Sequence, residues 1–87
     1  MYKYQVLKAD GTKEEFTLTD SLPLEGLQRN VGGFIQPVMR PQDYGIKTTG
    51  KVYVNEDGKN QMLPENPHVT RSDWDFLVGN ILIEEKV

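Results

Sequence analysis

The sequence predicts an α+β fold: a mainly antiparallel sheet of about five strands, with one short helix packed on one face. Two observations indicate this fold. Segments of alternating or continuous apolar residues are separated by turns that contain glycine, asparagine or proline, as between short strands. Only residues 24–31 show helical spacing, and two glycines follow them. The length of 87 residues suits one hydrophobic core, so residues 1–87 are expected to form a single domain.

The first eighteen residues are expected to form a β-hairpin. Tyr2, Tyr4 and Val6 alternate with polar residues, as in a strand with one buried face. Asp10-Gly11 is a typical turn, and residues 14–18 then supply the second strand.

The helix is expected to begin near Pro23 and to end at Gly32. Leu24, Leu27 and Val31 share one apolar face. Residues 19–21 (Thr-Asp-Ser) offer side chains for the N-cap, and Pro23 suits the first turn because its missing N–H is not needed there. Gly32 and Gly33 are expected to be structural, because a helix end favours a left-handed residue. Gly26 suggests a close approach of the helix to the sheet.

Two further strands are expected in the middle of the chain. Residues 34–39 are predicted as a buried third strand with Phe34 in the core, and Pro37 indicates an edge or a bulge. Residues 40–50 are expected to form a long loop that leaves room for a short strand around Ile46. Residues 51–55 alternate clearly and predict a fourth strand.

The last third of the chain is expected to contain a shaped loop and the central strand. Two prolines make residues 63–67 irregular, and residues 70–74 resemble a capping box that opens at most one helical turn. Residues 76–83 form the most apolar segment, which favours a central strand, with Gly79 as a structural residue at a bulge or a close backbone approach. The tail from residue 84 is expected to be solvated.

Composition excludes several classes of protein. There are 13 acidic and 10 basic residues with both signs interspersed, which disfavours a nucleic-acid binder. The absence of cysteine excludes disulfides, thiolate nucleophiles and cysteine-based metal sites. No apolar segment resembles a signal peptide or a membrane span, so we expect a soluble, cytoplasmic protein with no membrane partner.

No catalytic or metal-binding motif is complete. Residues 45–51 nearly match a phosphate-binding P-loop, but Val52 lacks the required hydroxyl and Lys51 opens a strand rather than a helix. Residues 55–58 resemble part of a calcium loop, but the flanking ligand positions are unsuitable. His68 is the only histidine, and the paired carboxylates Glu14/Glu15, Asp73/Asp75 and Glu84/Glu85 are interpreted as solvated. We therefore expect no enzyme activity, no cofactor and no metal.

The remaining polar and aromatic residues suit the binding of a small anionic or aromatic ligand. Aromatic side chains can stack on a base, arginine and lysine can contact phosphates, and asparagine can hydrogen-bond base edges. The candidate ligand-binding residues are Arg40, Tyr44, Lys47, Asn55, Lys59, Asn66, His68, Arg71 and Trp74. Each of these residues could also have no role in binding; arginines, for example, are usually ordinary surface residues.

Four blocks carry a resemblance to a known family. They are Val31-Gly-Gly-Phe-Ile35, Val54-Asn-Glu-Asp-Gly-Lys59, Leu63-Pro-Glu-Asn66 and Val78-Gly-Asn80. Together they resemble a family of short uncharacterised proteins carried mainly by bacteriophages, prophages and plasmids, and the likeness covers residues 22–83. Residues 43–50 and 70–74 depart from its usual pattern.

The resemblance implies a role in host takeover or in countering host immunity. With the ligand-binding set, it favours an anti-defence protein that sequesters a cyclic nucleotide signal without cleaving it, as a homo-oligomer in the cytoplasm of an infected bacterium. A pocket between subunits would let so small a chain enclose its ligand. The alternative is a protein-binding module that docks on a host enzyme, for instance through an edge of the first hairpin. A nuclease or phosphodiesterase, or a nucleic-acid binder, is less favoured.

Overall fold

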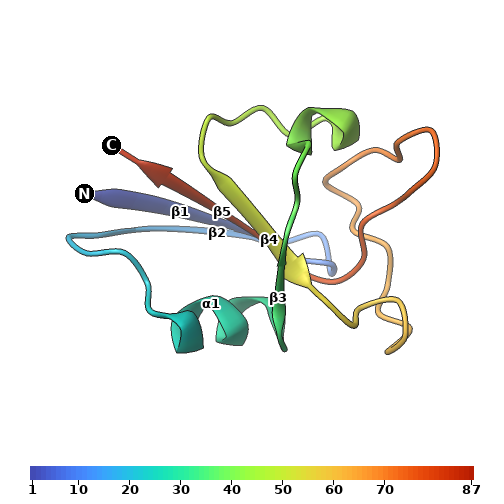
Figure 1. Ribbon diagram of the computed structural model, residues 1–87, viewed down its shortest axis with the longest axis horizontal. Coiled ribbons are helices and arrows are strands. Elements are labelled where there is room, and N and C mark those ends of the chain that lie inside the picture. Colours follow the sequence, from blue (N-terminus) through green and yellow to red (C-terminus); the bar gives the residue numbers. More distant parts are fainter.

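The computed structural model describes residues 1–87 and confirms the predicted fold class (Figure 1). Its elements in chain order are β1 (Tyr2–Leu7), β2 (Lys13–Leu18), α1 (Leu24–Val31), β3 (Ile35–Pro37), the 3-10 helix η1 (Pro41–Tyr44), β4 (Lys51–Asn55) and β5 (Ile81–Lys86). The five strands form one antiparallel sheet in the order β2-β1-β5-β4-β3. No helix is long and apolar enough to cross a membrane.

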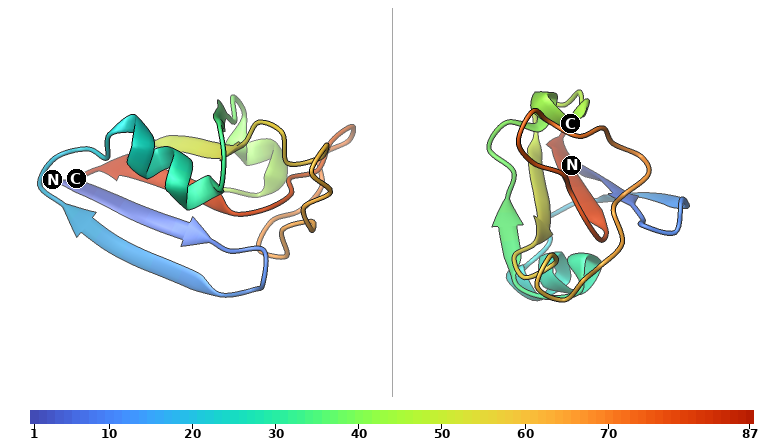
Figure 2. Two further views of the ribbon diagram at one scale, coloured as in Figure 1. Left: turned by 90° about the horizontal axis from the view of Figure 1, so that it is seen from below. Right: turned by 90° about the vertical axis from the view of Figure 1, so that its right-hand side faces the viewer.

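The last strand lies at the centre of the sheet, as predicted. β5 pairs with β1 on one side and with β4 on the other. The two ends of the chain consequently lie side by side, and the Val87 amide donates to the Met1 carbonyl at 2.9 Å (Figure 2).

The sheet is covered on both faces. On one face α1 packs Leu27 and Val31 against Tyr4, Val6 and Leu82. On the other face the loops supply Tyr44, Ile46 and Leu77. They pack against residues of three strands: Leu7 of β1, Val52 and Val54 of β4, and Ile81 and Ile83 of β5. Neighbouring β5 residues thus point into opposite cores, which explains the continuous apolar sequence of this strand.

The first hairpin is confirmed. Tyr2 faces Leu18 and Leu7 faces Lys13 across the β1–β2 pair. The turn is closed by a hydrogen bond from the Lys8 amide to the Thr12 carbonyl at 2.9 Å.

The helix spans the predicted residues, but its N-cap differs from the prediction. Gly32 ends the helix with φ 80°, and its amide donates to Gln28. The N-cap is Pro23 and no side chain caps the helix, because residues 19–21 lie too far upstream. Leu24 is 57% exposed, so the buried face of the helix is formed by Leu27 and Val31 without it. Gly26 approaches the Leu22 side chain rather than the sheet: a Cβ there would lie 2.9 Å from Leu22 Cδ2.

The third strand is shorter and more exposed than predicted. β3 spans only Ile35–Pro37 and lies at the edge of the sheet, as Pro37 indicated. The prediction that Phe34 is buried was wrong, because its side chain is 65% exposed beside this open edge. Ile46 is buried but lies in a loop after η1 rather than in a strand.

Two predictions for the last third of the chain, the bounds of the last strand and the solvated tail, are corrected. β5 begins at Ile81, because the backbone bends at Gly79 (φ 73°) and Leu77 and Val78 are buried before the strand starts. It also continues to Lys86, because Glu84 and Glu85 pair with β1. Residues 70–74 form no helical turn. Instead, Ser72 and Asp75 close a short loop. The Ser72 amide and hydroxyl both donate to the Asp75 carbonyl, and the Asp75 amide donates to the Ser72 hydroxyl.

Candidate functional site

The main concave feature is a groove of about 390 Å³ on the β3–β4 side of the molecule. Five short segments line it: residues 36–40, 43–44, 54–56, 59–60 and 74–78. They come from β3 and the loop that follows it, η1, the end of β4 and the segment before β5. The volume lies within the range of small-molecule sites, about 300–1,000 Å³.

The groove brings together five of the nine predicted ligand-binding residues. These five are Arg40, Tyr44, Asn55, Lys59 and Trp74. The other four, Lys47, Asn66, His68 and Arg71, do not line it. The candidate site in the structure is therefore this groove alone.

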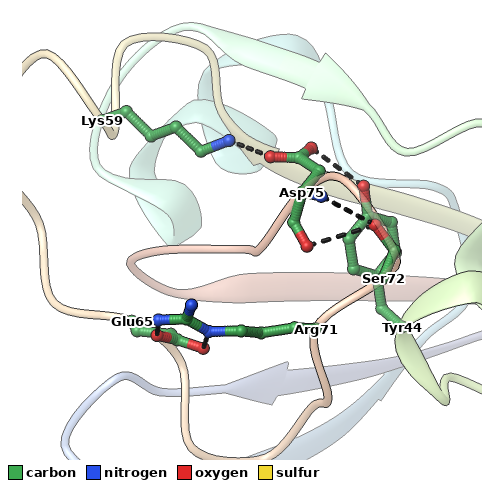
Figure 3. A network of polar contacts seen from close by, with 6 residues as sticks. All are labelled: Tyr44, Lys59, Glu65, Arg71, Ser72 and Asp75. Atoms are coloured by element: carbon green, nitrogen blue, oxygen red, sulfur yellow. Dashed lines mark hydrogen bonds and ion pairs between the residues drawn. The ribbon is translucent and has the colours of Figure 1, made fainter.

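Asp75 is the centre of a polar network in the groove wall (Figure 3). Its carboxylate accepts hydrogen bonds from the Tyr44 hydroxyl at 2.9 Å and from the Lys59 ammonium group. Its backbone amide donates to Ser72 Oγ at 3.0 Å. The network joins η1, the turn after β4 and the segment before β5, so it fixes the geometry of the groove.

The network shifts the pKa values of Tyr44 and Asp75, which are joined by a hydrogen bond. Burial and the hydrogen bond to Asp75 raise the pKa of Tyr44, so its hydroxyl stays a donor. Burial also raises the pKa of Asp75, but the hydrogen bonds from Lys59, the Phe76 amide and Tyr44 outweigh it, and the net shift is downward. Asp75 is thus held as a carboxylate.

Two cations lie close to the ring of Phe76. Lys59 Nζ is 4.7 Å from the centroid of the ring, and the Arg71 guanidinium carbon is 4.9 Å from it. Arg71 also forms a bidentate pair with Glu65, at 2.6 and 3.0 Å, which lowers the pKa of the Glu65 carboxyl. Arg71 and Lys59 are therefore both engaged by the protein itself.

Arg40 is the least constrained cation of the groove. Its Nε lies 3.2 Å from the Asp43 carboxylate, and its side chain is 68% exposed. Its two terminal nitrogens make no hydrogen bond or ion pair within the chain.

Both candidate asparagines are buried and hydrogen-bonded to the backbone. Asn55 is 5% exposed, and its Oδ1 accepts from the Asp57 amide at 2.8 Å. Asn66 is 1% exposed, and its amide group donates to the Leu7 and Gly79 carbonyls, both at 2.8 Å. Its Oδ1 accepts from the His68 amide at 2.9 Å. Asn66 therefore has a structural role, because no part of its amide is available to a ligand.

The remaining candidates and glycines lie outside the groove. His68 Nε2 lies 2.9 Å from the Thr12 carbonyl and links its loop to the first hairpin. Lys47 is exposed in the loop after η1. A Cβ on Gly33 would approach Asn55 Nδ2 to 2.8 Å, and one on Gly79 would approach Leu63 Cδ1 to 2.8 Å, so both positions have little room for a side chain.

Twelve of the 17 residues that line the groove were not predicted from the sequence as part of a site, and four of them are informative. Met39 belongs to no motif, Glu56 was noted only as part of a family block, and Asp75 was interpreted as a solvated carboxylate. Phe76 was assigned to a strand. Only the pairing of Tyr44 with Asp75, 31 positions apart, reveals the role of Asp75, and no local sequence signal indicates such a contact.

The groove contains side chains of different chemical kinds. It combines an exposed indole, two cations and the carboxylates of Asp43, Glu56 and Asp75. No group of three or more His, Cys, Asp or Glu side chains is placed to hold a metal ion.

Comparison with curated proteins and with solved structures finds no match. A comparison with family models matches residues 3–86 to DUF3846, described as a domain of unknown function. The match spans nearly the whole chain and includes residues of all five strands. The chain therefore belongs to the DUF3846 family.

Proposed function

We propose that this protein is a non-enzymatic binder that sequesters a nucleotide signal in the groove without cleaving it. The biological role we infer is that of a phage anti-defence protein, acting in the cytoplasm of an infected bacterium by removing a cyclic nucleotide immune signal. This role rests on the resemblance to proteins of mobile elements.

The observation that carries the proposal is the exposed Trp74 at the groove. Its side chain is 76% exposed. A large exposed aromatic beside a concave site is informative, since such surface is costly to leave in water and stacks well on a base. Arg40 lies in the same groove with free terminal nitrogens that suit a phosphate.

We further propose that the ligand is bound by a homo-oligomer. Met39 is 85% exposed where it lines the groove, and Trp74 is nearly as exposed. A second copy placed over this side would cover both side chains and enclose the ligand more fully.

The proposal is tested by a thermal-shift screen of cyclic mono-, di- and trinucleotides and cyclic ADP-ribose isomers, with mass measured by light scattering. A bound ligand raises the melting temperature as its concentration exceeds its dissociation constant. Trp74→Ala should abolish the shift while leaving the unliganded protein folded, because the side chain is mostly exposed. Met62→Ala is the matched control, since Met62 is 87% exposed but lies outside the groove. A screen in which no nucleotide stabilises the protein would contradict the proposal.

The absence of cleavage needs a separate measurement. The ligand is incubated with the protein, the protein is denatured, and the released molecule is identified by mass spectrometry. Recovery of intact ligand supports sequestration, whereas an altered product that depends on a single side chain would establish an enzyme.

Docking on a host enzyme is the second candidate. It is favoured by β2, which lies at an edge of the sheet and has β1 as its only neighbour. An edge strand can accept a partner strand through its free backbone groups. This function predicts one stoichiometric complex with a host protein and no effect of nucleotides on melting.

A further inference from the structure

The groove contains more acidic than basic side chains. Asp43, Glu56 and Asp75 line it with Arg40 and Lys59, so its formal charge is −1. Glu56 is exposed and takes part in none of the ion pairs of the structure. The one charged group of the groove without a partner is therefore a carboxylate, which repels polyphosphates.

Lys59 is not available to a phosphate. Its ammonium group is bound to Asp75 and lies over the ring of Phe76. Moving it would leave the Asp75 carboxylate, which is partly buried, with one donor fewer. A ligand phosphate would have to break the ion pair between Lys59 and Asp75 to contact the Lys59 ammonium group.

Arg40 is available, but for one phosphate only. Its contact with Asp43 uses Nε, and the two terminal nitrogens are free. A guanidinium group forms two parallel hydrogen bonds with a single phosphate. No second free cation lines the groove.

We propose that each copy seats a single phosphate at Arg40 with the base on Trp74, and that Glu56 discriminates against ligands with further phosphates. This inference rests on the proposed nucleotide-binding function. The preferred ligand class is a nucleotide in which one phosphodiester or monophosphate enters the groove, such as a cyclic mononucleotide. Nucleoside triphosphates, which are abundant in cells, would be excluded by charge.

The test uses a series in which the base and the ribose stay the same while the number and charge of the phosphates change. Adenosine is uncharged, cyclic AMP carries about one negative charge, AMP about two and ATP about four. Their dissociation constants are measured by isothermal titration calorimetry at low and at high salt, with the guanine and uracil series in parallel. ATP should bind about tenfold more weakly than cyclic AMP, and salt should narrow the difference.

Two variants identify the residues responsible. Arg40→Gln should make cyclic AMP bind no better than adenosine. Glu56→Gln should reduce the preference for cyclic AMP over ATP to about threefold or less. Glu25→Gln is the control, because it changes the net charge equally from an exposed position on α1, outside the groove.

The outcomes separate this inference from the proposed function. If ATP binds as tightly as cyclic AMP, or if Glu25→Gln and Glu56→Gln change the preference equally, the charge inference is wrong while nucleotide binding stands. If no member of the three series binds at millimolar concentration, and no cyclic di- or trinucleotide does, nucleotide binding itself fails.

Discussion

Replacing Asn66 by alanine should strongly destabilise the fold. The side chain is 1% exposed and makes three hydrogen bonds to backbone groups, those of Leu7, Gly79 and His68. Each hydrogen bond contributes about 1 kcal/mol net, and buried groups left without partners cost more. The expected loss in the free energy of unfolding is about 3 kcal/mol, a large part of the roughly 4–13 kcal/mol expected for a domain of this size.

Urea unfolding followed by circular dichroism measures this loss directly. The melting temperature should fall by about 12–24 °C, since 1 kcal/mol corresponds to about 4–8 °C in a domain of 60–100 residues. Asn60→Ala is the control, because Asn60 is exposed and its side chain makes no hydrogen bond within the chain, so a change within about 0.5 kcal/mol is expected. A loss below about 1 kcal/mol for Asn66→Ala would refute the reasoning.

Three further predictions concern acid, base and the helix end. The pKa of Asp75 is lowered in the folded state from its ordinary 3.8. Its contribution to the free energy of unfolding is therefore complete above pH 3.8 and disappears as the pH falls through the folded-state pKa. Asp75→Asn should flatten the dependence of stability on pH in this range, and an unchanged acid slope would contradict the network. Burial and the hydrogen bond to Glu84 raise the pKa of Tyr4 to about 12, so the free energy of unfolding should fall between pH 10 and about 12 in the native protein, and should fall less in Tyr4→Phe. At neutral pH, Tyr4→Phe should lose about 1–3 kcal/mol of stability, because the Leu22 amide loses its hydrogen-bond acceptor. Gly32→Ala should cost roughly 1–2 kcal/mol, because φ is 80° and a Cβ meets no atom within 4 Å, so only backbone strain acts; Gly32→Asn should cost less, and equal losses would argue against strain.

Local patterns predicted most of the fold. β4 was predicted at the residues where it occurs, because its alternation is strict and a turn follows it. α1 also has its predicted extent, since apolar spacing and Gly32 mark its ends. These features depend on neighbours within a few positions, which a sequence displays directly.

What the sequence did not predict depends on distant partners. Glu84 and Glu85 belong to β5 because β1 supplies their hydrogen bonds from the other end of the chain. The groove depends on the Tyr44–Asp75 contact, which no periodicity indicates. Asn66 has the same side chain whether it binds a ligand or the backbone, so only its burial decides between these roles.

The position of β5 has a consequence for folding during synthesis. This strand leaves the ribosome after the other four strands of the sheet, yet both β1 and β4 require it as a neighbour. Before residues 81–86 emerge, only the β1–β2 hairpin and the β3–β4 pair can form, and neither can bury its apolar side chains. We therefore expect the domain to fold only after translation of β5, and slowly for its length, because contacts between distant parts of a chain slow the folding of small proteins.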